Sequence, residues 1–100
     1  MTLLSKMNIS EYDERQISLM RESLRLFESE KISLKKLIDN LEGLLFCLQS
    51  VEVEWKNAFH GYWFVLEQIY AVSLFRNEII AKDDTDLVDA LMHLNELLSK

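Results

Sequence analysis

Residues 53–72 read VEWKNAFHGYWFVLEQIYAV and hold six of the ten aromatic side chains in this 100-residue sequence: Trp55, Phe59, Tyr62, Trp63, Phe64 and Tyr70. A helix turns by about 100° per residue, which places all of them except Phe64 on one side, together with Leu66 and Ile69. This apolar side is wider than a coiled-coil seam, and large aromatic side chains are an efficient way to bury area in a small core. The stretch predicts a long helix, over about residues 53–80, that packs into the core of the protein.

The opposite side of this helix is also apolar. Phe64 points about 180° away from Trp55, and Ala71, Val72 and Phe75 lie near it on the helical projection. Such a helix is either enclosed on both sides or exposes an apolar strip, and an exposed strip usually marks an interface. The sequence leaves both alternatives open.

The rest of the chain also predicts helices. It contains no proline and only two glycines, which favours helices joined by short turns. The apolar periodicity predicts helices over about residues 11–28, 34–49, 53–80 and 85–99. Ser10 with Asp13 resembles a capping box, Ser33 can cap the second helix, and carboxylates precede the fourth. The expected fold is all-α, a four-helix antiparallel bundle that forms a single domain over residues 1–100.

Composition limits the classes of partner. The sequence has 17 acidic and 11 basic side chains, a net charge of −6, and its 49% apolar and 28% charged residues are an ordinary folded balance. Nucleic-acid binding needs basic side chains, so we expect no nucleic-acid partner. No apolar stretch reaches the length of a membrane span, so we expect no membrane partner. Cys47 is the only cysteine, which fits a reducing cytoplasm. An acidic chain attracts basic protein partners.

The residues suited to catalysis or metal binding form no recognisable set. His60 and Glu67 are two helical turns apart and could shuttle a proton, but such a histidine is more often a boundary residue. His93 shares a helix face with Asp86 and Asp89, yet a metal site would need further ligands from elsewhere. We therefore predict no catalytic residues, no metal site and no cofactor, and a protein that is not an enzyme.

Acidic residues gather before the third helix and around the start of the fourth. From Glu78 onward there are six acidic residues against Lys82 and Lys100. Helix capping and solubility account for some of this charge. The segments near residues 50 and 80 should lie at opposite ends of the intervening helix. They would then form two separate acidic regions, unless helix tilt brings them together.

The sequence resembles a known family in four segments: LRLFESEKISLKKLIDNLEGLL (24–45), EVEWKNAF (52–59), WFVLEQIYAV (63–72) and DLVDALMHLNELL (86–98). Their order is similar to that in the small acidic all-helical immunity proteins of bacterial toxin–immunity pairs, of the colicin-D-like and contact-dependent inhibition type. The matching features are the turn at residues 30–33 and Trp55. The chain departs from the pattern at Glu30, where a small residue is usual, and in its shorter acidic runs.

The resemblance implies inhibition by occlusion, in which an acidic surface covers the basic active site of a cognate toxin nuclease. Close charge pairs across such an interface can contribute strongly to affinity. The candidate partner-binding residues are Glu52, Glu54, Phe64, Asp83, Asp84 and Asp86. The alternative function is a non-catalytic helical interaction or regulatory module, a homodimer that self-associates through the apolar strip at Phe64 and Phe75.

Overall fold

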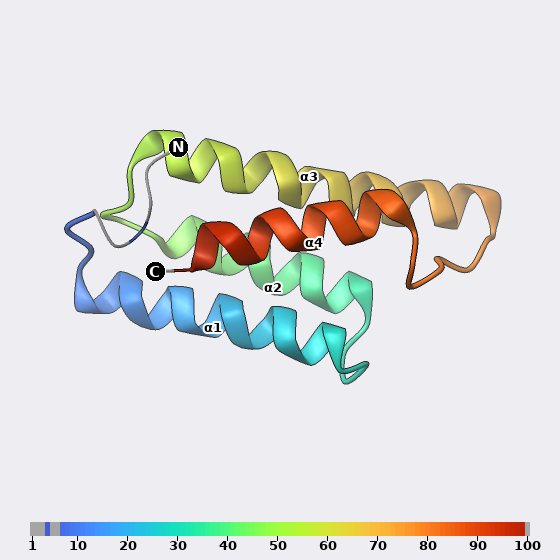
Figure 1. Ribbon diagram of the computed structural model, residues 1–100, viewed down its shortest axis with the longest axis horizontal. Coiled ribbons are helices and arrows are strands. Elements are labelled where there is room, and N and C mark those ends of the chain that lie inside the picture. Colours follow the sequence, from blue (N-terminus) through green and yellow to red (C-terminus); the bar gives the residue numbers. More distant parts are fainter. Residues whose placement is uncertain (1–3, 5–6, 100) are drawn as a thin grey trace.

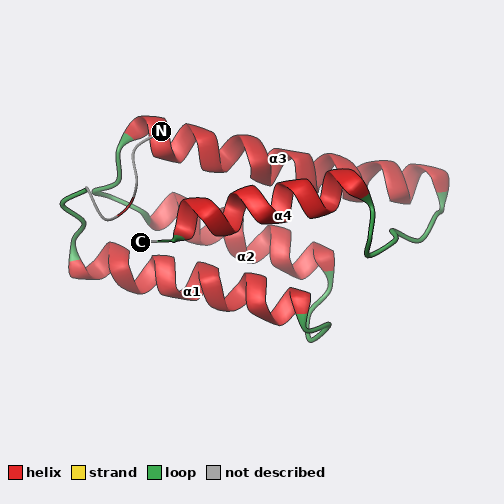
Figure 2. Ribbon diagram, viewed as in Figure 1, coloured by secondary structure: helices red, strands yellow, loops and turns green. Residues whose placement is uncertain are grey.

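A computed structural model describes residue 4 and residues 7–99 of the chain; residues 1–3, 5–6 and 100 lie outside the description. The described part contains four helices: α1 (Glu11–Glu28), α2 (Leu34–Cys47), α3 (Val53–Arg76) and α4 (Thr85–Leu98). The helices alternate in direction along the long axis of the molecule (Figures 1 and 2). Each packs against the next, and α4 also packs against α1, so the bundle is closed. The prediction of an all-α antiparallel four-helix bundle is confirmed.

Short polar side chains begin three of the helices. Ser10 and Ser33 each accept a hydrogen bond at 3.1 Å from the backbone N–H three residues further on. Asp84 does the same for α4 at 3.0 Å. These bonds satisfy N–H groups that have no partner within the helix. Glu52 precedes α3 but makes no side-chain capping hydrogen bond with the described residues.

The expected end of the third helix at residue 80 is wrong, because α3 ends at Arg76. Asn77 adopts a left-handed conformation with φ of 54°, which asparagine tolerates better than most residues. The chain then reverses, and the Glu78 backbone N–H donates to the Ser73 carbonyl at 2.9 Å. This is the bond of a Schellman C-cap. The apolar residues at 79 and 80 belong to the connection that follows the helix.

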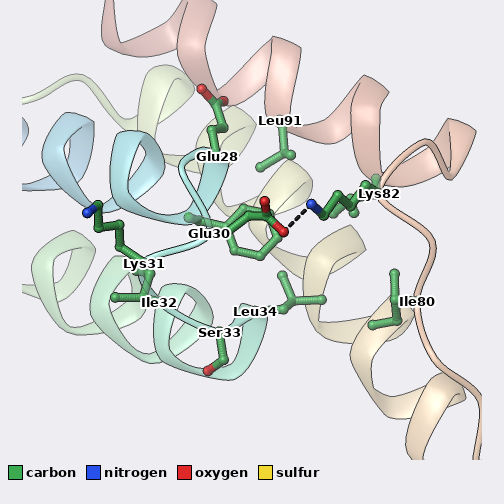
Figure 3. A pocket seen from close by; sticks show the side chains of 11 residues that line it. Glu28, Glu30, Lys31, Ile32, Ser33, Leu34, Ile80, Lys82 and Leu91 are labelled. Atoms are coloured by element: carbon green, nitrogen blue, oxygen red, sulfur yellow. Dashed lines mark ion pairs between the residues drawn. The ribbon is translucent and has the colours of Figure 1, made fainter.

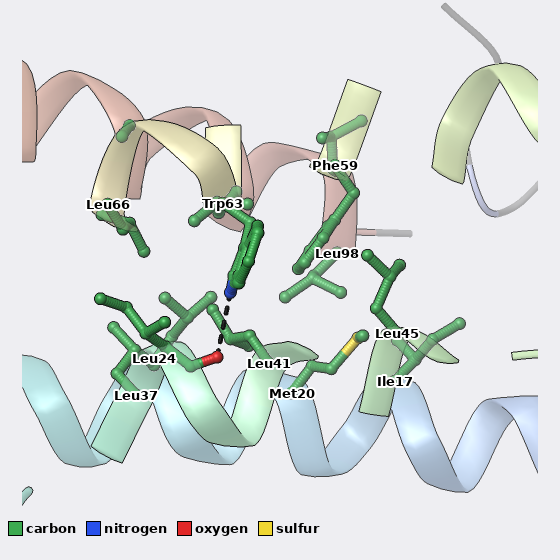
Figure 4. Close-up of a cluster of buried hydrophobic side chains, with 14 of the residues drawn as sticks. Ile17, Met20, Leu24, Leu37, Leu41, Leu45, Phe59, Trp63, Leu66 and Leu98 are labelled. Carbon is green, nitrogen blue, oxygen red and sulfur yellow. Dashed lines mark hydrogen bonds between the residues drawn. The ribbon is translucent and has the colours of Figure 1, made fainter. Parts of the chain in front are cut away.

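The predicted aromatic side of α3 is confirmed as core. Trp55, Phe59, Trp63 and Leu66 are buried. Leucine and isoleucine side chains from the other helices surround Phe59, Trp63 and Leu66 (Figure 4). The Trp63 ring nitrogen donates to the Ile38 carbonyl of α2 at 2.9 Å. The Trp55 ring nitrogen similarly donates to a carbonyl near the end of α4 at 2.8 Å. Both tryptophan rings therefore fill the core, and the N–H group of each has a hydrogen-bond acceptor.

The helices differ in length, and this difference positions the surface described next. α3 has 24 residues, whereas α2 and α4 have 14 each. The C-terminal part of α3 extends beyond the ends of its neighbours, and the connection to α4 folds back from there (Figure 1). We call this end of the bundle the distal end. No helix in the described residues is long and apolar enough to cross a bilayer.

Candidate functional site

The far side of α3 is exposed, which decides between the two alternatives that the sequence left open. Phe64 is 46% exposed and Val72 48%, whereas Phe75 is 92% exposed. Ala71 is exposed between them. These four residues form an apolar strip, here called the α3 strip, that runs from the middle of the helix to its distal end. Single exposed apolar residues are common, but several on one side of a helix usually mark a contact surface; here the exposed Gln68 separates Phe64 from the other three.

The connection after α3 continues this apolar surface and adds charge to it. Ile79 is 98% exposed. A groove of about 590 Å³ lies between α3 and the connection. Val72 and Ile79 contribute to its apolar lining, and Asp84 and Asp86 to its acidic lining. Apolar and acidic side chains thus share one groove at the distal end, together with one basic side chain, Arg76.

The carboxylates outnumber the basic side chains at the distal groove, where Glu78, Asp84 and Asp86 face a single Arg76 in the lining. Among the described residues, Asp83, Asp84 and Asp86 form no ion pair. Lys82 is next to them in sequence, but it pairs with Glu30 on the α1–α2 turn. Asp84 also caps α4, so its carboxylate has a structural role in addition to its charge. Because most of this charge faces solvent, the distal end favours a cationic partner.

The two acidic regions are not brought together. Glu52 and Glu54 are exposed at the start of α3, at the opposite end of the bundle from the distal groove. A 24-residue helix separates them, which is roughly 36 Å at 1.5 Å per residue. The six candidate contact residues therefore divide into a proximal pair, three aspartates at the distal end, and Phe64 near the middle of α3.

The two histidines make contacts that are unrelated to each other. The His93 ring stacks on Tyr62 with centroids 4.5 Å apart, and its Nδ1 lies 2.8 Å from the Asp89 backbone carbonyl oxygen. His60 lies against the Trp63 ring, 5.1 Å between centroids. In the described part of the chain, no three His, Cys, Asp or Glu residues come close enough to hold a metal ion. Cys47 is exposed at the end of α2.

One polar residue has a role that sequence reasoning missed. Asp13 was expected to complete a capping box, but its side chain is buried. It accepts hydrogen bonds from the Gln49 and Ser50 backbone N–H groups, at 3.0 and 2.6 Å, and from the Ser50 hydroxyl at 2.8 Å. Its periodic spacing from Ile17 and Met20 places it on the buried side of α1, and that spacing is the signal that could have identified it.

The pKa of Asp13 reflects two opposed effects. Burial is the largest single influence and raises the pKa, because it disfavours the charged carboxylate. The hydrogen bonds from Ser50 and Gln49 and the positive charge of Lys56 together outweigh it, so the pKa lies below its usual value. The carboxylate is therefore held ionised, and it ties the start of α1 to the α2–α3 connection.

Comparison with known proteins adds no family to this description. No protein family, curated protein or solved structure matches the chain. The likeness to immunity proteins consequently remains a prediction from the four sequence segments that carry it.

Proposed function

We propose that this chain is an immunity-type inhibitor that binds a basic bacterial toxin domain through its distal end and occludes that domain's active site. The single observation that carries the proposal is the shared groove, in which exposed apolar residues of α3 and its connection lie beside Asp84 and Asp86. The chain itself would carry out no chemistry, and inhibition would follow from steric and electrostatic blockage in the cytoplasm.

The chemistry of the distal end suits a nuclease active site. Such sites are basic because they bind phosphates, and carboxylates can take the place of those phosphates. Phe75 and Ile79 supply apolar area of the kind that forms the centre of an interface. The surrounding aspartates would raise the association rate and select a cationic partner. Because apolar and acidic side chains occur together, the distal end favours a specific protein partner over non-specific attraction of cations.

The distal end is a better candidate than the proximal pair. The helix dipole does not distinguish the two regions, because Glu52 and Glu54 begin α3 just as Asp84 and Asp86 begin α4. The proximal end also has exposed apolar side chains, with Val53 71% and Phe46 79% exposed, but basic Lys56 lines the groove beside Phe46. The distal end instead combines three aspartates, the α3 strip and a groove.

Self-association through the α3 strip is the second candidate, and the exposure of Phe64 and Phe75 favours it. The overall charge of −6 opposes it, because two copies would bring like charges together. Sedimentation equilibrium at micromolar concentration distinguishes the two functions. We expect a monomer. A dimer that Phe75→Asp converts to monomers would support self-association instead.

The test of inhibition uses bacterial growth. The C-terminal domain of the protein encoded immediately upstream is induced with and without this chain. We expect growth arrest that the chain relieves, and we expect relief to be lost in the Asp83→Lys/Asp86→Lys variant. Asp84 is left intact because it caps α4. Glu52→Lys/Glu54→Lys is the matched control, with the same charge change at the other end.

Three results would change the proposal. Toxicity that the chain does not relieve, or no toxicity, would reject that neighbour as the partner. Loss of relief in the proximal control, with the distal variant active, would move the interface to Glu52 and Glu54. Loss in both would make net charge the determinant, with no specific surface. Circular dichroism of each variant separates lost binding from lost folding.

A further inference from the structure

The exposed side of α3 presents a line of residues that carries no charge. Its outward positions recur four and three residues apart in alternation, and each of them is exposed: Asn57, Gly61, Phe64, Gln68, Ala71 and Phe75. Outward positions recur in this way on any surface helix, but those of α2 include the charged Lys36 and Asp39. We call the six residues of α3 the outer seam. An uncharged line with a spacing of 3.5 residues is typical of the contact between two packed helices.

Small and large residues share the outer seam, and packing within the chain does not account for its glycine. Apart from the backbone of α3 and the adjacent residues, no atom of the described chain lies within 4 Å of the position that a Cβ would take at Gly61. Glycine destabilises a helix interior, so it needs a reason there. The close approach of a second backbone is such a reason. On either side of such an approach, the rings of Phe64 and Phe75 would supply the apolar contact area.

The distal end of the outer seam is acidic. The distal groove reaches the seam at Gln68, which is part of its lining. Further along the same lining, the three carboxylates of Glu78, Asp84 and Asp86 accompany one basic side chain, that of Arg76. A helix that lies along the seam would therefore meet net negative charge at this end, which favours a cationic segment there.

Two neighbouring side chains preserve this negative charge. Lys82 extends towards the α1–α2 turn and pairs with Glu30 there (Figure 3), so its ammonium group is already engaged by a carboxylate outside the groove. Glu67 is exposed on the flank of the seam and forms no ion pair among the described residues. Both observations favour a basic partner for the surface around the seam.

A second copy of this chain does not supply the matching charge. In a parallel pair of α3 helices, the two acidic distal ends would face each other. In an antiparallel pair, each distal end would lie towards the start of the other α3, where Glu52 and Glu54 outnumber Lys56. Like charges would meet in both arrangements, which disfavours self-association through the seam.

We propose that the outer seam binds one amphipathic helix of a basic protein partner, with the apolar side of that helix along α3 and its cationic end at the distal groove. The inference rests on the proposed function for the identity of the partner, because it names the kind of segment with which the toxin domain would contact α3. Recognition of this kind reads apolar side chains at helical spacing and uses the charged end for orientation.

The probe is a synthetic helical peptide of three heptads, with leucines three and four residues apart and lysines in its last two turns, where cations favour a helix. One control peptide has the same composition with its leucines distributed around the helix. A second has glutamate in place of each lysine. Amide chemical shifts of ¹⁵N-labelled protein report binding, and we expect saturable shifts in residues 57–78 and 84–86. Both controls should bind more weakly, the acidic one by about tenfold or more, as expected for two or three partly exposed charge pairs.

Glutamine substitutions test the close approach. Gly61→Gln places a long side chain where the peptide backbone would lie, and it should weaken binding by about tenfold, although glutamine favours the helix more than glycine does. Ala71→Gln is a second variant of the same kind. Gly43→Gln is the matched control, because Gly43 is equally open but lies on α2, outside the seam. It should leave binding unchanged, and circular dichroism verifies that all three variants fold.

Several outcomes would overturn the proposal. These are the absence of saturable shifts, equal binding of either control peptide, and an unchanged affinity in both Gly61→Gln and Ala71→Gln. A dimer in sedimentation equilibrium that these variants dissociate would assign the seam to a second copy instead.

The growth assay separates this inference from the proposed inhibition. If Gly61→Gln and Ala71→Gln relieve growth arrest as well as the wild type does, inhibition does not use the seam and this inference fails alone. If the wild type relieves no arrest but binds the basic peptide as expected, the seam binds helices and the proposed inhibition of that neighbour fails alone.

Discussion

Replacing Asp13 by asparagine should lower the free energy of unfolding by about 2–3 kcal/mol at pH 7. The substitution keeps the size of the side chain but removes its charge and one of its two acceptor oxygens. The amide group would then direct its own N–H atoms towards donors on Gln49 and Ser50, which now bond to the carboxylate. The side-chain N–H groups of the variant would then face the donors of Gln49 and Ser50, where α1 meets the α2–α3 connection.

The magnitude follows from the three donors that share the carboxylate. Hydrogen bonds to charged groups contribute about 1.5–3 kcal/mol each. Gln49 and Ser50 are exposed, so water can replace part of what is lost, and about 1 kcal/mol for each donor is the appropriate scale. A domain of this size unfolds with about 5–15 kcal/mol. The variant should therefore stay folded and allow a full urea titration followed by circular dichroism.

The effect should depend on pH in a defined direction. The pKa of Asp13 is depressed in the folded protein, so its contribution is fully present above the unfolded value of about 3.9 and is lost as pH falls through the folded pKa. The difference between wild type and Asp13→Asn should be largest at neutral pH and shrink below about pH 4. Asp39→Asn, an exposed carboxylate on α2, is the control and should have a stability close to that of the wild type.

Two results would refute this reasoning. A stability of Asp13→Asn within about 0.5 kcal/mol of the wild type at pH 7 would mean that the carboxylate contributes no more than a surface residue. A difference that stays constant from neutral pH to pH 2 would mean that the lost stability comes from packing, since packing does not titrate.

Trp63→Phe should cost about 1.5–3 kcal/mol in urea unfolding, because it leaves a space in the core and deprives the Ile38 carbonyl of its ring N–H donor. Phe75→Asp should change stability by less than about 0.5 kcal/mol, because the side chain is 92% exposed; a larger loss would show that the strip supports the fold. Glu30→Gly should raise stability by about 0.5–1 kcal/mol, because φ is 62° there and glycine adopts that conformation without strain. Unchanged or lower stability would instead mean that the exposed ion pair between Glu30 and Lys82 contributes to the free energy of unfolding.

Local signals explain why the helix starts could be predicted. Ser10, Ser33 and Asp84 each act within three residues of themselves, so their capping role is visible in sequence alone. The end of α3 was harder to predict, because the apolar residues at 79 and 80 extend the helical pattern of the sequence past Arg76. Only the conformation of Asn77 stops it. A left-handed asparagine is a property of the folded backbone, which the apolar periodicity of the sequence does not report.

The sequence identified apolar and acidic side chains as candidates for the site but could not give their arrangement. The helical projection separated Phe64 from the core side of α3, yet it could not say whether another helix covers that side. That depends on which helices are neighbours and how long they are. Asp13 shows the same limit, because its partners at Gln49 and Ser50 are remote in sequence. The periodicity of the sequence predicted on which side of its helix each residue lies. Which element covers that side is known only from the packing of the helices.

The length of α3 connects the fold to the proposed function. At 24 residues it spans roughly 36 Å, against roughly 21 Å for the 14-residue α2 and α4. Neighbours of that length cannot cover its distal turns, so Phe75 is exposed because of the architecture itself. Since a side chain that contacts little contributes little to stability, Phe75 and Ile79 can be altered while the core formed around Trp55 and Trp63 is preserved. The proposed binding and the folding would therefore depend on different residues of the same helix, and variants of its two sides can test them separately.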